Sequence, residues 1–255
     1  MVSGTGVPTS TSIIAYRGAS QQAPENTLPA IEKALAAGAD AIALDVQGTR
    51  DDEPVVFADS KLDRTTDRTG RVNQLTLKEV QALDAGSWFK PEFKGTRVPT
   101  LAQALTGLGP DVRLVLQVPD LRADSALAKN VVNALSVRKK PADDVLLFSN
   151  SDTLKAFRER APEFGYALAL GERIEGWVAI AKAEKLGLKI VRPHRAQANA
   201  AFVRQAREKG LLVWVHFADE EDEMRDLLEL RVDGIVTSRP ERLKRVLEEP
   251  AGAEA

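Results

Sequence analysis

The chain has 255 residues, a length that one α/β barrel commonly fills, so length alone does not require a second domain. Hydrophobic residues make up 44% and charged residues 28% of the composition, which excludes disordered and collagen-like chains. Lys and Arg number 35 and Asp and Glu number 37, so a net charge of −2 argues against nucleic-acid and anionic-membrane partners. The absence of cysteine excludes disulfides, thiolate metal sites and a cysteine nucleophile.

The two ends of the chain differ in composition from the rest. Residues 1–12 carry neither a basic residue nor an apolar run, which predicts a flexible leader rather than a secretory signal. Residues 249–255 are small, acidic and interrupted by proline, which predicts an unpacked tail. The apolar runs are far shorter than the roughly 18–20 residues that span a bilayer. We therefore expect a soluble, cytoplasmic protein with one domain over 13–248 and no membrane span.

Short apolar runs typical of buried strands recur along the chain, separated by segments with helical spacing such as Leu28, Ile31 and Leu35. In chain order the runs are 13–15, 41–46, 55–57, 113–118, 145–149, 166–170, 188–192, 211–216 and 233–237. This alternation favours a closed TIM-type (β/α)8 barrel in the α/β class over an open sheet. The runs are one too many for eight strands, so one of them must lie outside the barrel.

The segment 59–98 interrupts the alternation. It is long, rich in Thr, Asp, Arg and Gly, and contains one short helical pattern at 76–84. It follows the third run, so the sequence predicts a long insertion after the third strand. Long ordered loops at the carboxyl ends of barrel strands commonly form a lid or a pocket wall, and we expect that role here.

Several strings of residues resemble the glycerophosphodiester phosphodiesterase family. They are IAYRGASQQAPENT, DRTTDRTG, DAGSWF, RVPTLAQAL and the late ELRVDGIVTSRPERL, and the resemblance extends from Ile13 to about Leu247. It implies a TIM-type barrel and a place in lipid metabolism. It also implies hydrolysis of glycerophosphodiesters to glycerol 3-phosphate and an alcohol, with a divalent metal (Mg²⁺ or Ca²⁺) as cofactor.

Both catalytic histidines of the family are replaced. The first strand of the family ends in His-Arg-Gly, where this chain has Tyr16-Arg17-Gly18. After the third strand the family has His-Asp, and here the pair is Ala58-Asp59. Losing a positioned acid or base typically lowers the rate about 10²–10⁴-fold. We therefore expect no catalytic residue at the family positions.

The metal ligands of the family are also mostly replaced. Its Glu-x-Asp motif corresponds to Ala43-Leu44-Asp45, and its Glu-x-Lys motif corresponds to Gln117-Val118-Pro119. The Trp-Thr pair of the family is best matched by His216-Phe217. One carboxylate and one amide bind a divalent cation weakly, so Asp45 would be the only remaining metal ligand and no tightly bound cofactor is expected.

The surviving Arg17 offers a planar fork of donors that can bind a phosphate or a carboxylate. The alternative is that it pairs internally with Glu25 or Asp45, since a half-buried arginine needs a partner. Asp45 and Asp59 are left without their usual partners, so each either titrates high or pairs with Arg17 or Arg64. Their expected role is structural.

Other polar and aromatic residues carry weaker signals. Glu25, Asn26 and Thr27 precede the helix near Leu28, and we favour a capping role for Asn26 or Thr27. The four large aromatic residues singled out can shape an apolar pocket, although core packing is the default role for such residues. These residues are Trp88, Phe89, Trp177 and Trp214.

The chain contains two histidines. His194 follows a strand and a proline and is interpreted as a loop residue. His216 lies at a strand end, where it can serve as a displaced acid/base with Tyr16 or Asp45 as its partner.

Three functional hypotheses follow. The first is an inactive family member, a pseudoenzyme that acts as a binding or scaffold protein or is an engineered barrel, and that holds a small anionic or phosphate-containing ligand. The second is an active phosphodiester hydrolase or lyase whose relocated site uses Arg17, Asp45 and His216. The third is a structural barrel that binds nothing. The composition does not separate them and indicates no oligomeric state. The candidate ligand-binding residues are Arg17, Glu25, Asp45, Asp59, Gln117 and His216.

Overall fold

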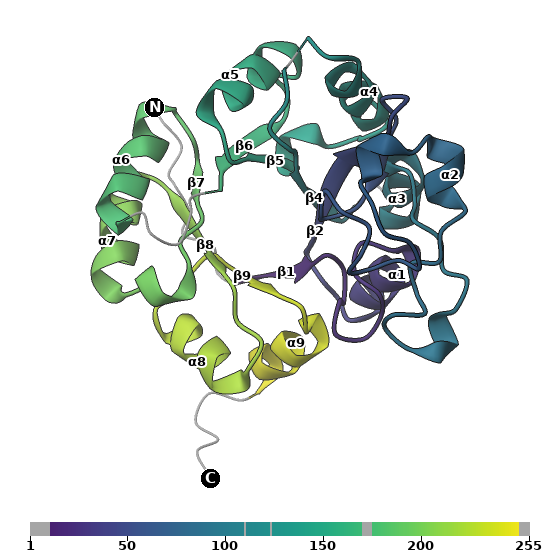
Figure 1. The fold of residues 1–255 in the computed structure, drawn as a ribbon. Coiled ribbons are helices and arrows are strands. Elements are labelled where there is room, and N and C mark those ends of the chain that lie inside the picture. The colour runs from purple at the N-terminus through teal and green to yellow at the C-terminus, as the bar shows by residue number, and fades with distance from the viewer. Residues whose placement is uncertain (1–10, 110, 123, 170–174, 250–255) are drawn as a thin grey trace.

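The computed structural model of the chain describes residues 11–109, 111–122, 124–169 and 175–249. Within these ranges, eight parallel strands form a barrel that helices surround (Figure 1). The barrel strands are β1 (Ser12–Tyr16), β2 (Ala41–Gly48), β4 (Arg113–Gln117), β5 (Val145–Phe148), β6 (Gly165–Leu168), β7 (Ile190–Val191), β8 (Leu212–His216) and β9 (Gly234–Thr237). The predicted TIM-type fold is confirmed.

The barrel is nearly closed. Its strands are neighbours in the order β6-β5-β4-β2-β1-β9-β8-β7. Between the two ends of this order, the described residues contribute one parallel bridge, from Ala169 to Arg192. Side chains from alternate strand positions, among them Ile14, Val115 and Trp214, fill the interior. The barrel is therefore a packed core rather than a channel.

The strand outside the barrel is β3 (Pro54–Val56). It pairs with the end of β2 in antiparallel fashion, with Val46 opposite Val56 and Gly48 opposite Pro54. Only residues 49–53 separate the two strands, which is enough for a hairpin but too few for the crossover that a parallel barrel strand needs. The predicted run 55–57 therefore accounts for the ninth strand.

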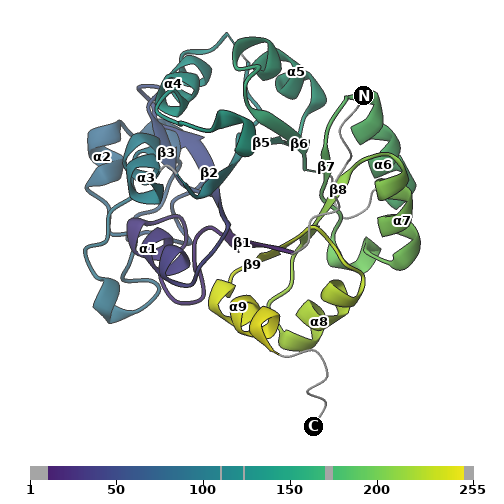
Figure 2. The same ribbon diagram turned by 180° about the vertical axis from the view of Figure 1, so that it is seen from behind.

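The insertion follows β3 and packs around a small core of its own, which includes Phe57, Leu62 and Val72. It contains the 3-10 helices η1 (Val72–Gln74) and η2 (Pro91–Phe93) and the short helix α2 (Leu77–Gln81). A capping box between Thr76 and Glu79 starts α2. Seen from behind, α2 lies outside α3 at the edge of the molecule (Figure 2). The helical pattern at 76–84 is confirmed, although the helix is shorter than predicted.

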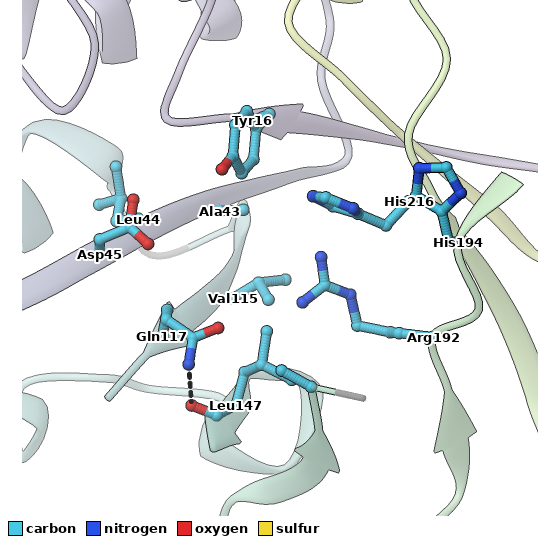
Figure 3. Close-up of a pocket in the computed structure, with 11 residues that line it drawn as sticks. Tyr16, Ala43, Leu44, Asp45, Val115, Gln117, Leu147, Arg192, His194 and His216 are labelled. Carbon is cyan, nitrogen blue, oxygen red and sulfur yellow. Dashed lines mark hydrogen bonds between the residues drawn. The ribbon is translucent and has the colours of Figure 1, made fainter. Parts of the chain in front are cut away.

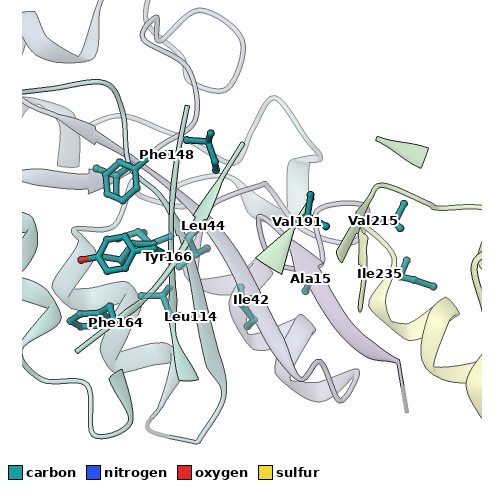
Figure 4. Close-up of a cluster of buried hydrophobic side chains, with 14 of the residues drawn as sticks. Ala15, Ile42, Leu44, Leu114, Phe148, Phe164, Tyr166, Val191, Val215 and Ile235 are labelled. Atoms are coloured by element: carbon teal, nitrogen blue, oxygen red, sulfur yellow. The ribbon is translucent and has the colours of Figure 1, made fainter. Parts of the chain in front are cut away.

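Helices between the barrel strands cover the outside of the sheet (Figures 1 and 2). They are α1 (Leu28–Ala36), α3 (Leu101–Leu108), α4 (Ala126–Leu135), α5 (Ser151–Arg160), α6 (Gly176–Lys185), α7 (Ala200–Glu208), α8 (Glu221–Glu229) and α9 (Pro240–Glu248). The main core lies between these helices and the strands and includes Ile42, Leu114 and Phe148 (Figure 4). Among the residues described, no helix is long and apolar enough to cross a membrane.

The structure describes only a few residues of the two predicted chain ends. Residues 1–10 of the expected leader, residues 250–255 of the expected tail and Leu170 at the end of the run 166–170 lie outside the described residues. Ser12 already belongs to β1, and the Thr11 hydroxyl donates to the Val232 carbonyl at 2.7 Å. Glu249, expected to belong to the tail, accepts a hydrogen bond from Arg225 at 2.9 Å. Ser12, expected in the leader, is therefore part of β1, and Glu249, expected in the tail, forms an exposed ion pair with Arg225.

Candidate functional site

A cavity of about 210 Å³ lies at the end of the barrel where the strands terminate (Figure 3). Its lining comes from the ends of strands all round the barrel, the place where barrel enzymes carry their active sites. The lining residues are Tyr16, Ala43, Leu44, Asp45, Val115, Gln117, Leu147, Ala169, Arg192, His194 and His216.

Strand register brings the replaced family positions together. Tyr16 is the register partner of Ala43 across β1 and β2, and Asp45 is the partner of Gln117 across β2 and β4. Ala43 and Asp45 are two residues apart on one strand, so both face the cavity. Ala58 does not line the cavity, and its carbonyl accepts from the Gln47 amide at 3.0 Å.

Arg17 lies beside the cavity with both sides of its guanidinium group occupied. Its Nη1 lies 2.7 Å from Glu25 Oε1, and its Nε lies 2.7 Å from Asp45 Oδ2. The backbone at Arg17 has a φ of 58°, which turns the chain sharply after β1. The guanidinium also stacks on the Tyr16 ring, 4.6 Å from its centroid. The internal pairing considered for Arg17 is confirmed.

Arg64 extends this network to the insertion. It donates to both Glu25 carboxylate oxygens at 2.7 Å and to Asp59 Oδ2 at 2.7 Å. The Asp45 side chain is less accessible to solvent than that of Asp59. Burial raises the pKa of Asp45 despite the neighbouring Arg17. Of the two alternatives, Asp59 shows the ion pair with Arg64, and Asp45 shows both the ion pair with Arg17 and a raised pKa. Arg64 thus links the insertion to the mouth of the barrel through ion pairs. No residue of 59–98 lines the cavity, so the expected lid or pocket wall is not seen.

The expected capping role of Asn26 is wrong. Asn26 is buried, its amide nitrogen donates to Asp45 Oδ2 at 3.0 Å, and its amide oxygen accepts from the Asp45 backbone at 3.1 Å. Thr27 occupies the N-cap position of α1, but its hydroxyl donates to the Pro24 carbonyl instead of capping the helix. The Asn26 side chain bonds to Asp45 instead of capping the helix, because the buried Asp45 carboxylate requires hydrogen-bond donors.

The residues at the mouth do not fit a divalent cation. In the described part of the chain, no three His, Asp or Glu side chains are grouped to hold a metal. Ala43 offers no ligand, Asp45 is already bonded to Arg17 and Asn26, and the cavity contains a second guanidinium, Arg192. Mg²⁺ and Ca²⁺ require about six oxygen ligands, and a nearby guanidinium repels either ion.

His216 stays uncharged in this cavity. Burial is the main cause that lowers its pKa to about 4, and Arg192 adds to the effect. Its ring meets the Tyr16 ring edge-on at 5.5 Å, and no carboxylate of the described residues forms a hydrogen bond or an ion pair with it. The structure therefore does not join His216 to Asp45 as an acid/base pair.

We expect the stability of the protein to depend on pH through His216. The unfolded chain binds a proton near pH 6.5 and the folded protein only near pH 4. The unfolded state therefore binds more protons between these values, and the free energy of unfolding falls, by at most about 3 kcal/mol, as the pH drops from 6.5 to 4. Urea unfolding at several pH values measures the slope, and His216→Gln is expected to reduce it. An NMR titration midpoint of His216 near pH 6.5 would contradict the burial effect.

Arg192 and His194 also line the cavity. Arg192 directly follows β7 and was not singled out, although a charged residue at the end of a predicted barrel strand is a usable signal. His194 is in a loop as predicted, but its backbone pairs with His216, which brings it to the cavity.

The aromatic residues singled out do not shape the cavity. Trp214 is buried within the barrel interior. Trp88 and Trp177 are exposed, and Phe89 contacts Trp88 and Phe93 on the insertion. Core packing, the default role, therefore holds for Trp214.

Known proteins resemble this chain in sequence and in fold. The model of the glycerophosphoryl diester phosphodiesterase family matches residues 17–242. The glycerophosphodiester phosphodiesterase of Caldanaerobacter subterraneus is 30% identical over 239 residues, which cover 91% of this chain and 96% of the relative. The solved structure of an Oleispira antarctica phosphodiesterase, in complex with its product sn-glycerol-3-phosphate, matches with a TM-score of 0.84 and 27% identity over 93% of this chain and 97% of that chain. The glycerophosphodiester phosphodiesterase of Agrobacterium tumefaciens matches with a TM-score of 0.79 and 29% identity over 92% and 100% of the two chains. The chain therefore belongs to the glycerophosphoryl diester phosphodiesterase family.

Proposed function

We propose that this barrel binds a small phosphate-containing molecule in its mouth cavity and does not hydrolyse it. One observation carries the proposal. The cavity keeps cationic and neutral hydrogen-bond donors, whereas Asp45, the carboxylate among its described lining residues, is already bonded to Arg17 and Asn26. Such a lining favours an anion over a metal cation.

The size of the cavity and the structural neighbour support this ligand class. A volume of about 210 Å³ lies below the roughly 300–1,000 Å³ of pockets for drug-sized ligands. The Oleispira antarctica phosphodiesterase, with the same fold, binds sn-glycerol-3-phosphate. Glycerol 3-phosphate and phosphodiesters with short substituents are therefore the first ligands to test.

The neutral groups of the lining are suited to donate hydrogen bonds. Burial raises the pKa of Tyr16, so its hydroxyl keeps its proton at neutral pH. The uncharged imidazole of His216 carries one N–H. Both groups can donate to phosphate oxygens without a change of charge.

Among its described lining residues, the cavity offers no side chain suited to act as the acid or the base in hydrolysis of a phosphodiester. Cleavage of a phosphodiester requires a proton for the leaving alkoxide, and each positioned acid or base contributes about 10²–10⁴ in rate. The family histidine positions hold Tyr16 and Ala58. His216 is the remaining candidate, and its pKa of about 4 leaves it without a proton to give as a cationic acid at neutral pH. The relocated site with Arg17, Asp45 and His216 is therefore the weaker hypothesis.

Isothermal titration calorimetry tests the proposal. Glycerol 3-phosphate is titrated into the protein once with EDTA and once with Mg²⁺. We expect binding of one ligand per chain with the same Kd in both buffers, because the site supplies its own positive charge. No binding of glycerol 3-phosphate, inorganic phosphate or glycerophosphocholine, or binding only with Mg²⁺, would overturn the proposal.

A further inference from the structure

Arg192 lies in the mouth cavity as a buried cation whose guanidinium has no ion-pair partner among the described residues. The residue is 9% exposed, and its Nε is buried without a hydrogen bond. No carboxylate of the described ranges forms an ion pair with its guanidinium. Figure 3 shows this group directed into the cavity, below His216 and across from Gln117.

Arg138, the other arginine that is buried as a whole among the described residues, is fully engaged. Arg138 bonds to Asp144 and to the carbonyls of Gly109 and Val112. Arg17 is half-buried, and its Nε also lacks a hydrogen bond, but its guanidinium forms ion pairs with two carboxylates. A buried guanidinium without such partners lowers stability, since its lost hydration is not replaced.

The charge on Arg192 persists at neutral pH. Burial lowers its pKa to about 10, which still leaves the group protonated. Asp45 attracts it across the cavity, but Asp45 forms its contacts with Arg17 and Asn26. The cavity therefore holds one positive charge that an incoming anion can neutralise.

We propose that Arg192, and not Arg17, anchors the phosphoryl group of the ligand. This inference rests on the proposed function and names the residue and the ligand chemistry of the same site. A guanidinium binds two non-bridging phosphate oxygens through parallel N–H bonds. Both phosphomonoesters and phosphodiesters with small substituents offer two such oxygens.

The surrounding donors favour a phosphoryl group over a carboxylate. Tyr16, Gln117 and His216 line the same cavity and carry polar groups. A carboxylate has two oxygens, which the guanidinium alone can use. A phosphomonoester has a third non-bridging oxygen, and a phosphodiester has its ester oxygens, that remain available for the neutral donors.

Three proteins test the assignment: the unmodified chain, Arg192→Met and the control Arg17→Lys, which keeps the positive charge near Asp45. Calorimetry with glycerol 3-phosphate and inorganic phosphate gives the affinities, and thermal unfolding without ligand gives the stability. We expect Arg192→Met to weaken binding at least about tenfold, since charged hydrogen bonds are lost. We also expect its melting temperature to equal or exceed that of the unmodified chain, because an unpaired charge is removed. The Kd of Arg17→Lys is expected to lie within about threefold of that of the unmodified chain. The reason is that the guanidinium of Arg17 is already occupied by Glu25 and Asp45.

The outcomes separate the two proposals. If the unmodified chain binds phosphate and Arg192→Met binds it equally well, the assignment of Arg192 is wrong and the proposed function stands. If the unmodified chain does not bind, the proposed function itself fails. D-Glycerate binding as tightly as glycerol 3-phosphate would overturn the preference for a phosphoryl group. Should Arg192→Met not fold, the Nε–Hε NMR signal of Arg192 in the unmodified chain must shift on phosphate addition, and an unchanged signal would overturn the assignment.

Discussion

Replacing Asp144 with alanine is expected to lower the free energy of unfolding by about 3–5 kcal/mol. Asp144 is fully buried, and its carboxylate bonds to Arg138 at 2.7 and 3.0 Å and to the Leu114 backbone at 2.7 Å. Arg138 also donates to the carbonyls of Gly109 and Val112. The substitution would leave a buried guanidinium and a strand amide without their acceptor at the start of β4. Urea unfolding followed by circular dichroism measures the effect.

Two controls make this result specific. Asp124→Ala removes an exposed ion pair with Arg122 and is expected to change stability by less than about 1 kcal/mol. The double variant Arg138→Met with Asp144→Ala removes both charges and is expected to regain part of the loss, since whole buried pairs are often replaceable. An Asp144→Ala effect as small as that of Asp124→Ala would contradict the role of this pair.

Restoring the family residues at four positions is expected to produce metal-dependent phosphodiesterase activity. The combined substitutions are Tyr16→His, Ala43→Glu, Ala58→His and Gln117→Glu. The register places residue 43 opposite residue 16 and residue 117 opposite Asp45, so the new carboxylates would surround one point with Asp45. We expect hydrolysis of glycerophosphocholine in Mg²⁺, Ca²⁺ or Mn²⁺ at least about 100-fold above the background seen with the unmodified chain, because Tyr16→His returns an acid or base to the lining of the cavity.

The control for this variant adds Asp45→Asn, which removes the carboxylate that the chain already has. It is expected to abolish both the activity and any rise of the melting temperature on metal addition. A folded four-residue variant without metal-dependent turnover would contradict the claim that these four positions account for the altered site. Pro119 and Arg192 would then be the next positions to change.

The barrel was predictable because strand and helix spacing alternate along the chain. Each of the nine apolar runs contributes residues to a strand, and the excess run is the hairpin partner of β2. What periodicity does not show is strand direction, so β3 was not separable from the barrel strands. The short connection between residues 48 and 54 is the signal that distinguishes β3, since it is too short for the crossover between parallel strands.

The site was partly predictable because side chains alternate along a strand and motifs mark the strand ends. Ala43, Asp45, Gln117 and His216 line the cavity as expected from these rules. Contacts between distant segments could not be read in this way. Arg64 binds Glu25 across 39 residues, and Asn26 binds Asp45 across 19. Whether Arg192 has a partner likewise depends on side chains from other strands.

Phosphorus-31 NMR of glycerophosphocholine in the presence of the protein tests the central claim, binding without hydrolysis, most directly. One spectrum reports binding through the width and position of the diester signal and turnover through a new monoester signal. The account predicts a diester signal that broadens or shifts with protein and never converts, in Mg²⁺, Ca²⁺, Mn²⁺ or EDTA alike. A glycerol 3-phosphate signal that grows with any of these metals and is abolished by EDTA would contradict it.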